Sequence, residues 1–335
     1  MRAFFVALRS STVAAFAGLL ALPAAAWAQP VPPGTTLAIG DPRIEFALRQ
    51  SGEINKLPFK VTWANIEGGP RTLQAFRAGA LDVGSGADIP PIHAHWTNLP
   101  VKVVAARLRQ DPLHHPVYQI GIAPGAKINS FADLRGKKIA YSPGQAQGVL
   151  VLRILQKAGL GQKDVHLVEL PSTTDVYANA LQSRLVDAAP MAVVFAKRYL
   201  ATFGKDGAKV LPHGLRDDIE YLDAPISVLS NPAKAAAIRE YVRFWARALR
   251  WIEAHPDLWA NAYYVKDQGL NLGDARYTAQ SFGIADVPAN WNDIIARQQQ
   301  TIDLLARETG QKSFPAAELF DRRLEHVAAD ALSGK

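Results

Sequence analysis

The sequence predicts an α/β protein with two similar lobes, each a mainly parallel sheet flanked by helices, followed by a helical C-terminal region. Three observations predict this fold class. Short apolar runs alternate with amphipathic stretches over residues 36–190, which is typical of parallel strands joined by helices. Residues 75–84 recur in altered form at 180–189, and a repeated α/β unit favours two lobes with a ligand cleft between them. From residue 233 onward the pattern is helical.

The repeat reads AFRAGALDVG in its first copy and ALQSRLVDAA in its second. Each copy predicts the end of an amphipathic helix, a tight turn and a short buried strand that begins at Leu-Asp or Val-Asp. Proline heads the next apolar segment after each copy, as Pro90-Pro91 and as Pro190. We therefore expect the two copies to occupy equivalent places in the two lobes.

The elements expected in the first lobe follow from the same alternation. Pro70 suits the first turn of a helix and Gly79 suits the position that ends one. The expected strands are 36–40, 59–66, 81–84 and 101–106, and the expected helices are 44–50, the segment from Pro70 to Gly79, and 92–96.

The α/β alternation breaks at residues 114–116 and resumes at residue 118. Residues 130–133 and 172–175 have the spacing of a capping box, in which a serine and an acidic residue start a helix. Strands are expected at 118–123, 138–141 and 165–170, with helices at 147–157 and, after the second lobe, at 233–254.

The N-terminus has the form of a secretory signal peptide. Arg2 and Arg9 precede an apolar stretch at 13–22, and Ala26-Trp27-Ala28 offers a small-x-small cleavage pattern. The apolar stretch is shorter than the roughly 20 residues that a membrane-spanning helix needs. We expect cleavage after Ala28 and export of the remainder of the 335-residue chain to the periplasm.

Composition narrows the function classes. The chain has no Cys, which excludes disulfides, thiolate catalysis and cysteine-based metal sites. The formal net charge is +7, and removal of residues 1–28, with two Arg and no acidic residue, leaves +5, which mildly favours anionic ligands. No run of Lys and Arg exceeds two residues, so nucleic acid is not expected as a partner.

Glycine-bearing turns at predicted strand ends are the candidates for ligand contact. The segment YSPGQAQG at 141–148 places unpaired backbone N–H groups at a helix start, where the helix dipole favours an anion. Ser142 and Gln145 would supply side-chain donors there. The counterpart after the first copy of the repeat is GSGADIPP at 84–91, whose glycines allow a ligand to approach the backbone closely.

Two further turns, GDPR at 40–43 and GGPR at 68–71, lie at strand ends that lead into helices. In open α/β sheets these are the crevice positions. Arg43 is the cation that we expect near a bound anion.

Histidine and serine patterns predict neither a metal site nor catalysis. His93 and His95 are two residues apart, so on a helix they do not share a metal as i, i+4 residues do. His114 and His115 fall in an expected loop, and their role stays open. No G-x-S-x-G surrounds any Ser. We expect no catalytic residue, no metal and no cofactor.

Several stretches resemble the aliphatic sulfonate, nitrate and taurine binding proteins of ABC importers. The block from GGP at 68–70 through the first copy of the repeat to ADIPP at 87–91 is similar to the first lobe of those proteins. The segment INSFADLRGKKIA at 128–140 resembles their entry into the second lobe, I-x-S-x-x-D-L-x-G-K-x-V. Further similar stretches are the turn at 142–148, AGL at 158–160 and WIEAHP at 251–256.

The resemblance implies a type II periplasmic binding protein fold, whose two lobes close on a ligand by hinge motion. Lobe I would comprise 35–118 plus 226–335, lobe II 121–222, with hinge crossings near 118–122 and 222–227. The ligand-binding residues that it implies, carried over position by position, are Asp41, Arg43, Gly69, Pro70, Ser85, Gly86, Asp88, Ser142, Gly144, Gln145, Ser172, Thr173, Pro190 and Met191.

The chain departs from the family pattern in two places. Many members carry an aromatic or acidic residue beside the proline that corresponds to Pro190, where this chain has Ala189 and Met191. The segment DPLHH at 111–115 is also unusual. Both departures leave the identity of the ligand open.

The expected function is that of a periplasmic solute-binding protein. It would capture a small, anionic organic solute, such as a sulfonate, taurine or a nitrate-like anion, and deliver it as a monomer to an inner-membrane ABC permease with its ATPase. Two alternatives remain: a ligand-sensing protein for a membrane receptor, and a thiamine-pyrimidine-type binding protein or enzyme on the same scaffold. That enzyme depends on a cysteine cluster, which this chain lacks.

Overall fold

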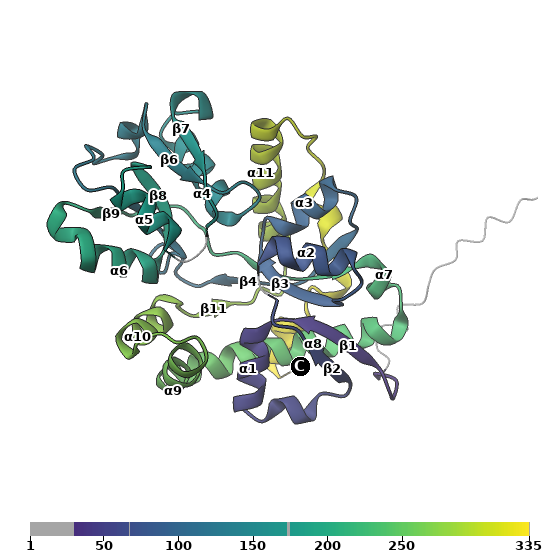
Figure 1. Ribbon diagram of the computed structural model, residues 1–335. Coiled ribbons are helices and arrows are strands. Elements are labelled where there is room, and N and C mark those ends of the chain that lie inside the picture. Colours follow the sequence, from purple (N-terminus) through teal and green to yellow (C-terminus); the bar gives the residue numbers. More distant parts are fainter. Residues whose placement is uncertain (1–29, 67, 173–174, 335) are drawn as a thin grey trace, which may run out of the picture.

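The computed structural model describes residues 30–66, 68–172 and 175–334, which form two α/β lobes and a helical C-terminal region (Figure 1). Lobe I contains a six-stranded sheet and lobe II a five-stranded sheet. Lobe I takes its strands from both sides of lobe II in the sequence, so the chain passes between the lobes twice.

The sheet of lobe I has the strand order β11-β4-β10-β3-β1-β2. The first four strands of the chain point in the same direction, whereas β10 and β11 run antiparallel to their neighbours. The sheet is therefore mixed, with the mainly parallel character that the alternation of strands and helices predicts. Its strands are β1 (Thr36–Gly40), β2 (Lys60–Trp63), β3 (Val83–Ala87), β4 (Val101–Arg109), β10 (Glu220–Pro225) and β11 (Ala285–Asp286).

The sheet of lobe II has the strand order β7-β6-β8-β5-β9. Here β5 is the strand that runs antiparallel to both of its neighbours, and β6, β7 and β8 are parallel to one another. Its strands are β5 (Tyr118–Ile122), β6 (Lys138–Tyr141), β7 (His166–Glu169), β8 (Ala188–Ala192) and β9 (Lys209–Leu211).

Helices cover both faces of each sheet and supply the cores. The largest apolar cluster lies between the sheet of lobe I and the long helix α8, where Tyr241 and Trp245 are fully buried. The helices are α1 (Pro42–Gln50), α2 (Gly69–Arg77), α3 (Pro90–Trp96), α4 (Ala146–Lys157), α5 (Val176–Gln182), α6 (Val193–Phe203), α7 (Ile226–Leu229), α8 (Pro232–Ala254), α9 (Pro256–Trp259), α10 (Leu272–Ser281), α11 (Asn292–Thr309) and α12 (Val327–Ser333). Short 3-10 segments are η2 (Glu53–Lys56), η3 (Phe131–Leu134), η4 (Gln162–Asp164), η5 (Gly204–Asp206), η7 (Ala316–Leu319) and η8 (Arg322–Leu324), and η6 (Ala260–Asp267) is a π-helix.

The two copies of the sequence repeat occupy equivalent places, as predicted. The first copy ends α2 and enters β3, and the second ends α5 and enters β8. The orders β2-β1-β3-β10-β4 and β7-β6-β8-β5-β9 match when β1 is laid on β6 and β3 on β8. In both sheets the strand that the repeat forms has an antiparallel neighbour, which is β10 beside β3 in lobe I and β5 beside β8 in lobe II.

The aspartate of each copy holds the strand that the copy forms against its parallel neighbour. The backbone N–H of Asp82 donates to the carbonyl oxygen of Ala38 (2.8 Å), and its carboxylate accepts from the N–H of the same residue (2.9 Å). Asp187 makes the same pair of bonds with Lys138, at 2.7 and 2.8 Å. Lys234 of α8 also donates to the carboxylate of Asp82 (2.6 Å). The repeated Asp is therefore a structural residue of each lobe.

The crossings between the lobes are the segments 110–117, between β4 and β5, and 212–219, between β9 and β10. The segments 118–122 and 222–227, which the sequence analysis assigned to the crossings, lie slightly later in the chain. These two segments fall largely on β5 and β10, each of which lies between two neighbouring strands of its sheet.

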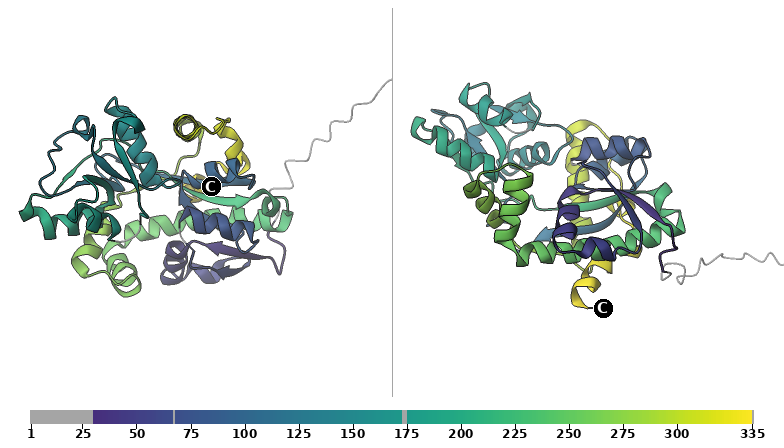
Figure 2. Two further views of the ribbon diagram at one scale, coloured as in Figure 1. Left: turned by 45° about the horizontal axis from the view of Figure 1, so that its top comes forward. Right: turned by 60° about the horizontal axis from the view of Figure 1, so that its bottom comes forward.

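The C-terminal region binds to both lobes. Helix α8 runs beneath the sheet of lobe I and leads to α9 and α10, which lie under lobe II (Figures 1 and 2). The carboxylate of Asp274 in α10 accepts from Lys197 (2.8 Å) and Arg198 (2.6 Å) of α6. Gln162 of lobe II donates to the carboxylate of Glu308 in α11 (3.0 Å). The region is helical as expected except at β11, which pairs with β4.

Other local predictions have mixed outcomes. The capping box at 130–133 is present and starts a 3-10 turn, with Asp133 accepting from the N–H of Ser130 (2.8 Å). The second box includes residues 173 and 174, and the predicted signal peptide comprises residues 1–28; these lie outside the described residues. In the described part of the chain, no helix has the length and apolarity required to cross a bilayer.

Replacement of the repeated aspartate should destabilise the protein. We expect Asp82→Ala and Asp187→Ala each to lower the free energy of unfolding by about 1–3 kcal/mol, because a strand N–H loses its acceptor. Asn keeps an acceptor oxygen and should cost less. Urea unfolding measures the effect, with Asp206→Ala at an exposed position as the control. Equal stability of all three Ala variants would contradict the assignment.

Candidate ligand site between the lobes

A cavity of about 440 Å³ lies between the lobes. Its walls come from strand-end turns of lobe I, from the turn after β6 in lobe II, and from the second crossing. The lining residues are Asp41, Arg43, Gly68, Gly69, Pro70, Ser85, Gly86, Ala87, Pro90, Arg107, Arg109, Val117, Tyr118, Gly144, Gln145, Ala146, Gln147, Asp217, Asp218, Ile219, Glu220 and Phe282.

The glycines of lobe I are explained by close packing of the turns. A Cβ on Gly84 would lie 2.4 Å from a side-chain carbon of Thr72, and one on Gly69 would lie 2.3 Å from the ring of Pro90. Larger residues would therefore push α2 away from the end of β3. The hydroxyl of Ser85, which faces the cavity, lies 3.4 Å from the carbonyl oxygen of Gly40.

The turn of lobe II reaches the cavity through Gly144 and Gln145. Gly144 has a positive φ of 76°, which L residues with a Cβ rarely adopt. Gln145 is the N-cap of α4, and its amide oxygen accepts a hydrogen bond from the hydroxyl of Ser172. His93 of lobe I packs against this turn, since a Cβ on Gly144 would lie 3.4 Å from the Nε2 atom of His93.

The strongest interaction in the cavity wall is a carboxylate between two guanidinium groups. Glu220, at the start of β10, forms ion pairs with Arg43 of α1 and Arg107 of β4. Register places Glu220 directly opposite Arg107 on the neighbouring strand. Burial alone would raise the pKa of Glu220, but Arg107 and Arg43 outweigh it and lower the pKa to about 2. The carboxylate is therefore charged at neutral pH.

The two guanidinium groups keep unused donors. The Nε atoms of Arg43 and Arg107 are buried and have no hydrogen-bond partner. Arg109, two residues along the same strand, donates to the carbonyl oxygens of His115 (2.5 Å) and Ser281 (3.2 Å). All three arginines line the cavity, so their guanidinium groups offer positive charge to an anion with several oxygens.

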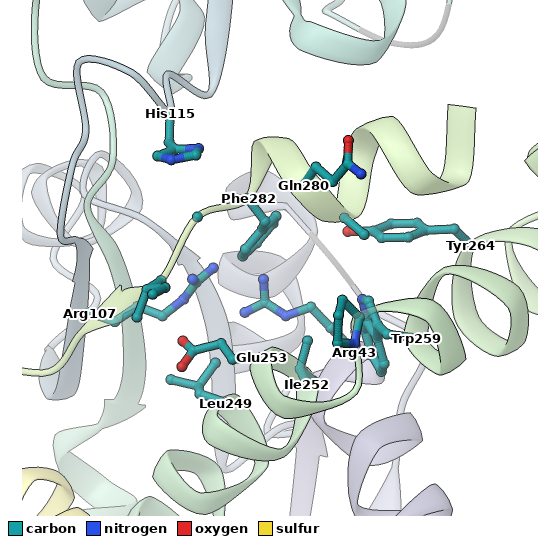
Figure 3. A pocket seen from close by; sticks show the side chains of 14 residues that line it. Arg43, Arg107, His115, Leu249, Ile252, Glu253, Trp259, Tyr264, Gln280 and Phe282 are labelled. Atoms are coloured by element: carbon teal, nitrogen blue, oxygen red, sulfur yellow. The ribbon is translucent and has the colours of Figure 1, made fainter. Parts of the chain in front are cut away.

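Phe282 lies against all three arginines. The guanidinium carbons of Arg43, Arg107 and Arg109 are 5.1, 4.7 and 4.9 Å from the centre of its ring. Figure 3 shows the Arg43 and Arg107 side chains approaching each other below this ring. The ring face attracts cations, and it offsets part of the repulsion among the three like charges.

Asp41 is another acidic group of the wall. It is the N-cap of α1, where its carboxylate accepts from the N–H of Ile44 (3.4 Å) and the hydroxyl of Tyr241 (3.2 Å). Burial raises the pKa of Asp41 to about 7, an effect that Arg43 opposes and Glu220 reinforces. Near neutral pH this carboxyl group is therefore protonated in a large part of the molecules.

Eight of the fourteen residues singled out from the sequence line the cavity: Asp41, Arg43, Gly69, Pro70, Ser85, Gly86, Gly144 and Gln145. Ser172 contacts Gln145 behind them, and Thr173 lies outside the described residues.

The remaining four do not line it. Ser142 is buried beneath the turn, and Asp88 faces Arg153 across the lobe boundary at 3.9 Å. Pro190 and Met191 lie inside β8, where the Met191 side chain packs on Gly121 in the core of lobe II. Both residues are paired with β5 inside the sheet, Pro190 with Ile120 and Met191 with Gln119.

Sequence reasoning missed the charged residues that dominate the site, namely Arg107, Arg109, Glu220, Asp217 and Asp218. One signal was available: Arg107 and Arg109 occupy alternate positions at the end of β4, after the apolar run at 103–106. Alternate residues of a strand share a face, so two arginines there indicate a charged site at the strand end.

The histidines form no metal site. Within the described part of the chain, no group of three or more His, Cys, Asp or Glu residues is arranged to hold a metal ion. His114 is exposed and pairs with Asp111 (2.8 Å), whereas His115 lies against Gly283 near the arginines.

Comparisons with known proteins agree with this architecture. The model of the family described as NMT1/THI5 like matches residues 60–257. A protein of Escherichia coli (strain K12) named for binding aliphatic sulfonates is 32% identical over 155 residues. That match covers 46% of this chain and 46% of the relative, so it spans just under half the length of each.

Solved structures match over most of the chain. The periplasmic aliphatic sulphonate binding protein SsuA of Escherichia coli has a TM-score of 0.71 at 22% identity, over 87% of this chain and 92% of that one. The alkanesulfonate-binding protein SsuA of Xanthomonas axonopodis pv. citri, bound to MOPS, has 0.67 at 22%, over 91% and 98%. A C-to-S variant of the desulfurization enzyme DSZB has 0.61 at 17%, over 90% and 99%. At these identities the likeness shows the fold, which binding proteins and an enzyme share.

The raised pKa of Asp41 should appear as a pH dependence of stability. Its stabilising protonation is complete below the ordinary pKa of 3.8 and is lost as the pH rises through about 7. Between pH 5 and pH 8, the free energy of unfolding of the wild type should therefore fall by on the order of 2 kcal/mol relative to Asp41→Asn. Urea unfolding at several pH values measures the difference. Parallel pH profiles of the two proteins would show that Asp41 does not titrate in this range.

Proposed function

The chain belongs to the NMT1/THI5-like family, and from this premise we propose that it is a periplasmic solute-binding protein of an ABC importer. Its signal peptide would direct export and be cleaved after Ala28. The mature protein would act as a monomer, bind its solute between the lobes and deliver it to an inner-membrane permease with its ATPase. The observation that carries the proposal is the interlobe cavity, because turns of both lobes line it together with three arginines.

The proposed ligand is an organic sulfonate. A sulfonate presents three equivalent acceptor oxygens, and the wall of lobe I presents the guanidinium groups of Arg43 and Arg107. From lobe II, the start of α4 at Gln145 adds backbone N–H groups and the positive end of a helix. The sulfonate-binding relatives favour this class over nitrate or carboxylates.

Closure would follow from the same geometry. We propose that the crossings at 110–117 and 212–219 act as the hinge between lobe I and lobe II. A ligand held by Arg43 on one side and by Gly144 and Gln145 on the other binds the closed form more tightly than the open one. Such a difference in affinity is what shifts the population toward closure.

The enzyme alternative receives less support. The desulfurization enzyme with this fold was solved as a variant in which a cysteine is replaced by serine, and this chain has no Cys. The cavity wall offers guanidinium and carboxylate groups held in ion pairs, which suit binding of an anion without a chemical step. A role as a sensor for a membrane receptor would use the same closed form.

Substitution of Arg43 tests the proposal. We expect Arg43→Gln to weaken binding of ethanesulfonate about 10- to 100-fold, because a charge-assisted hydrogen bond to the sulfonate is lost. Isothermal titration with ethanesulfonate, taurine, nitrate and acetate measures affinity and selectivity. Arg49→Gln, an exposed position on the same helix, is the matched control and should bind as the wild type does. Absence of sulfonate binding by the wild type would refute the proposal.

A further inference from the structure

A second cavity of about 290 Å³ lies behind the arginines. It shares Arg43, Arg107 and Phe282 with the interlobe cavity, so the guanidinium groups form the partition between the two spaces. Figure 3 shows it enclosed by the last turns of α8 below, by Trp259 and Tyr264 at one side, and by Phe282 and Gln280 above.

The lining of this second cavity is mainly apolar. Its apolar residues are Leu249, Ile252, Pro256, Trp259, Ala279 and Ile284. The acidic group in its floor, Glu253, is already satisfied by the N–H of Ala285 (2.7 Å) and by Arg250 (2.5 Å). The guanidinium groups of Arg43 and Arg107 form the partition, and the space behind it offers mostly apolar contact.

We infer that the second cavity receives the apolar part of the ligand, and that the preferred solute is a sulfonate with an aromatic or similarly bulky body rather than a short alkyl sulfonate. This inference rests on the proposed function. The sulfonate group would sit on the Arg43–Arg107 partition and the body would extend past Phe282 toward Trp259. A cavity of about 150 Å³ lined by Leu, Ile and Phe holds benzene, so 290 Å³ has room for two fused rings.

The chain around the second cavity fits a ligand subsite. It is walled by segments from distant parts of the sequence: α1, the end of β4, the end of α8 and the α10–β11 connection. His115 of the first crossing also lines it and packs on Gly283, so a ligand body there would contact the connection between the lobes. A ligand in the subsite would therefore contact both lobe I and the segment that joins the lobes.

The inference is tested by titrating two sulfonates into the wild type and into a variant in which a larger side chain fills the second cavity. The wild type should bind naphthalene-1-sulfonate about 100-fold more tightly than methanesulfonate, because the rings leave water for an apolar wall. Ala279→Phe, a half-buried position on α10 that faces the cavity, should remove most of this advantage and leave the affinity for methanesulfonate unchanged. Ala289→Phe, at an exposed position outside the cavity, is the matched control.

The outcomes separate the inference from the proposed function. Equal affinity of the wild type for both sulfonates, or an unchanged ratio in Ala279→Phe, overturns the subsite but leaves sulfonate binding intact. If neither sulfonate binds to the wild type, the proposed function fails and the subsite with it. Should Ala279→Phe not fold, Ile284→Trp at the exposed rim of the cavity replaces it with the same expectation.

Discussion

The interaction on which the site depends is the carboxylate of Glu220 held between Arg43 and Arg107. It connects three separate pieces of the chain: the first helix, the end of β4 and the strand by which the chain returns from lobe II. A buried ion pair is costly to form, and its contribution to stability alone is often small. Its effect here is geometric, because it fixes the direction of two guanidinium groups in the wall of a cavity.

The same strand also explains why the fold can hold such a group. β10 enters the sheet of lobe I antiparallel, between β3 and β4, so its first residue lies at the end where those two strands finish. In lobe II, β5 takes the equivalent place next to β8. Each lobe therefore receives the chain that arrives from the other lobe as an interior strand. The bonds of Asp82 and Asp187 secure the parallel neighbour in both sheets, which keeps the strand ends at a common edge.

Much of this architecture could be predicted from the sequence, because short-range patterns encode it. Alternation of apolar strands and helices, the Ser130–Asp133 cap and the repeated Asp are local signals that need no knowledge of tertiary contacts. The glycine turns at 84–86 and 144–145 were found for the same reason. The partners of these turns were not found: Glu220 meets Arg107 across 113 residues, and Phe282 meets three arginines from two distant segments. Pairing of strands sets such contacts, and register cannot be read from composition.

A related cause explains why some of the predicted residues do not line the cavity. The family resemblance, carried over position by position, placed Pro190 at the site, whereas the proline that lines the cavity is Pro90, which follows the first copy of the repeat. In lobe II the corresponding proline lies within the strand and pairs with Ile120 of β5, whereas Pro90 begins a helix. The proline after the first copy therefore starts a helix at the cavity, whereas the proline after the second copy lies within a strand of the sheet. Equivalence of the lobes extends to their strands and to the repeated Asp, but not to the residues that line the cavity.

The charged groups of the cavity all come from lobe I and the second crossing, and lobe II contributes backbone and amide donors. A cleft with one charged wall and one neutral wall can close on an anion without bringing like charges together, which suits a protein that must open again to release its solute.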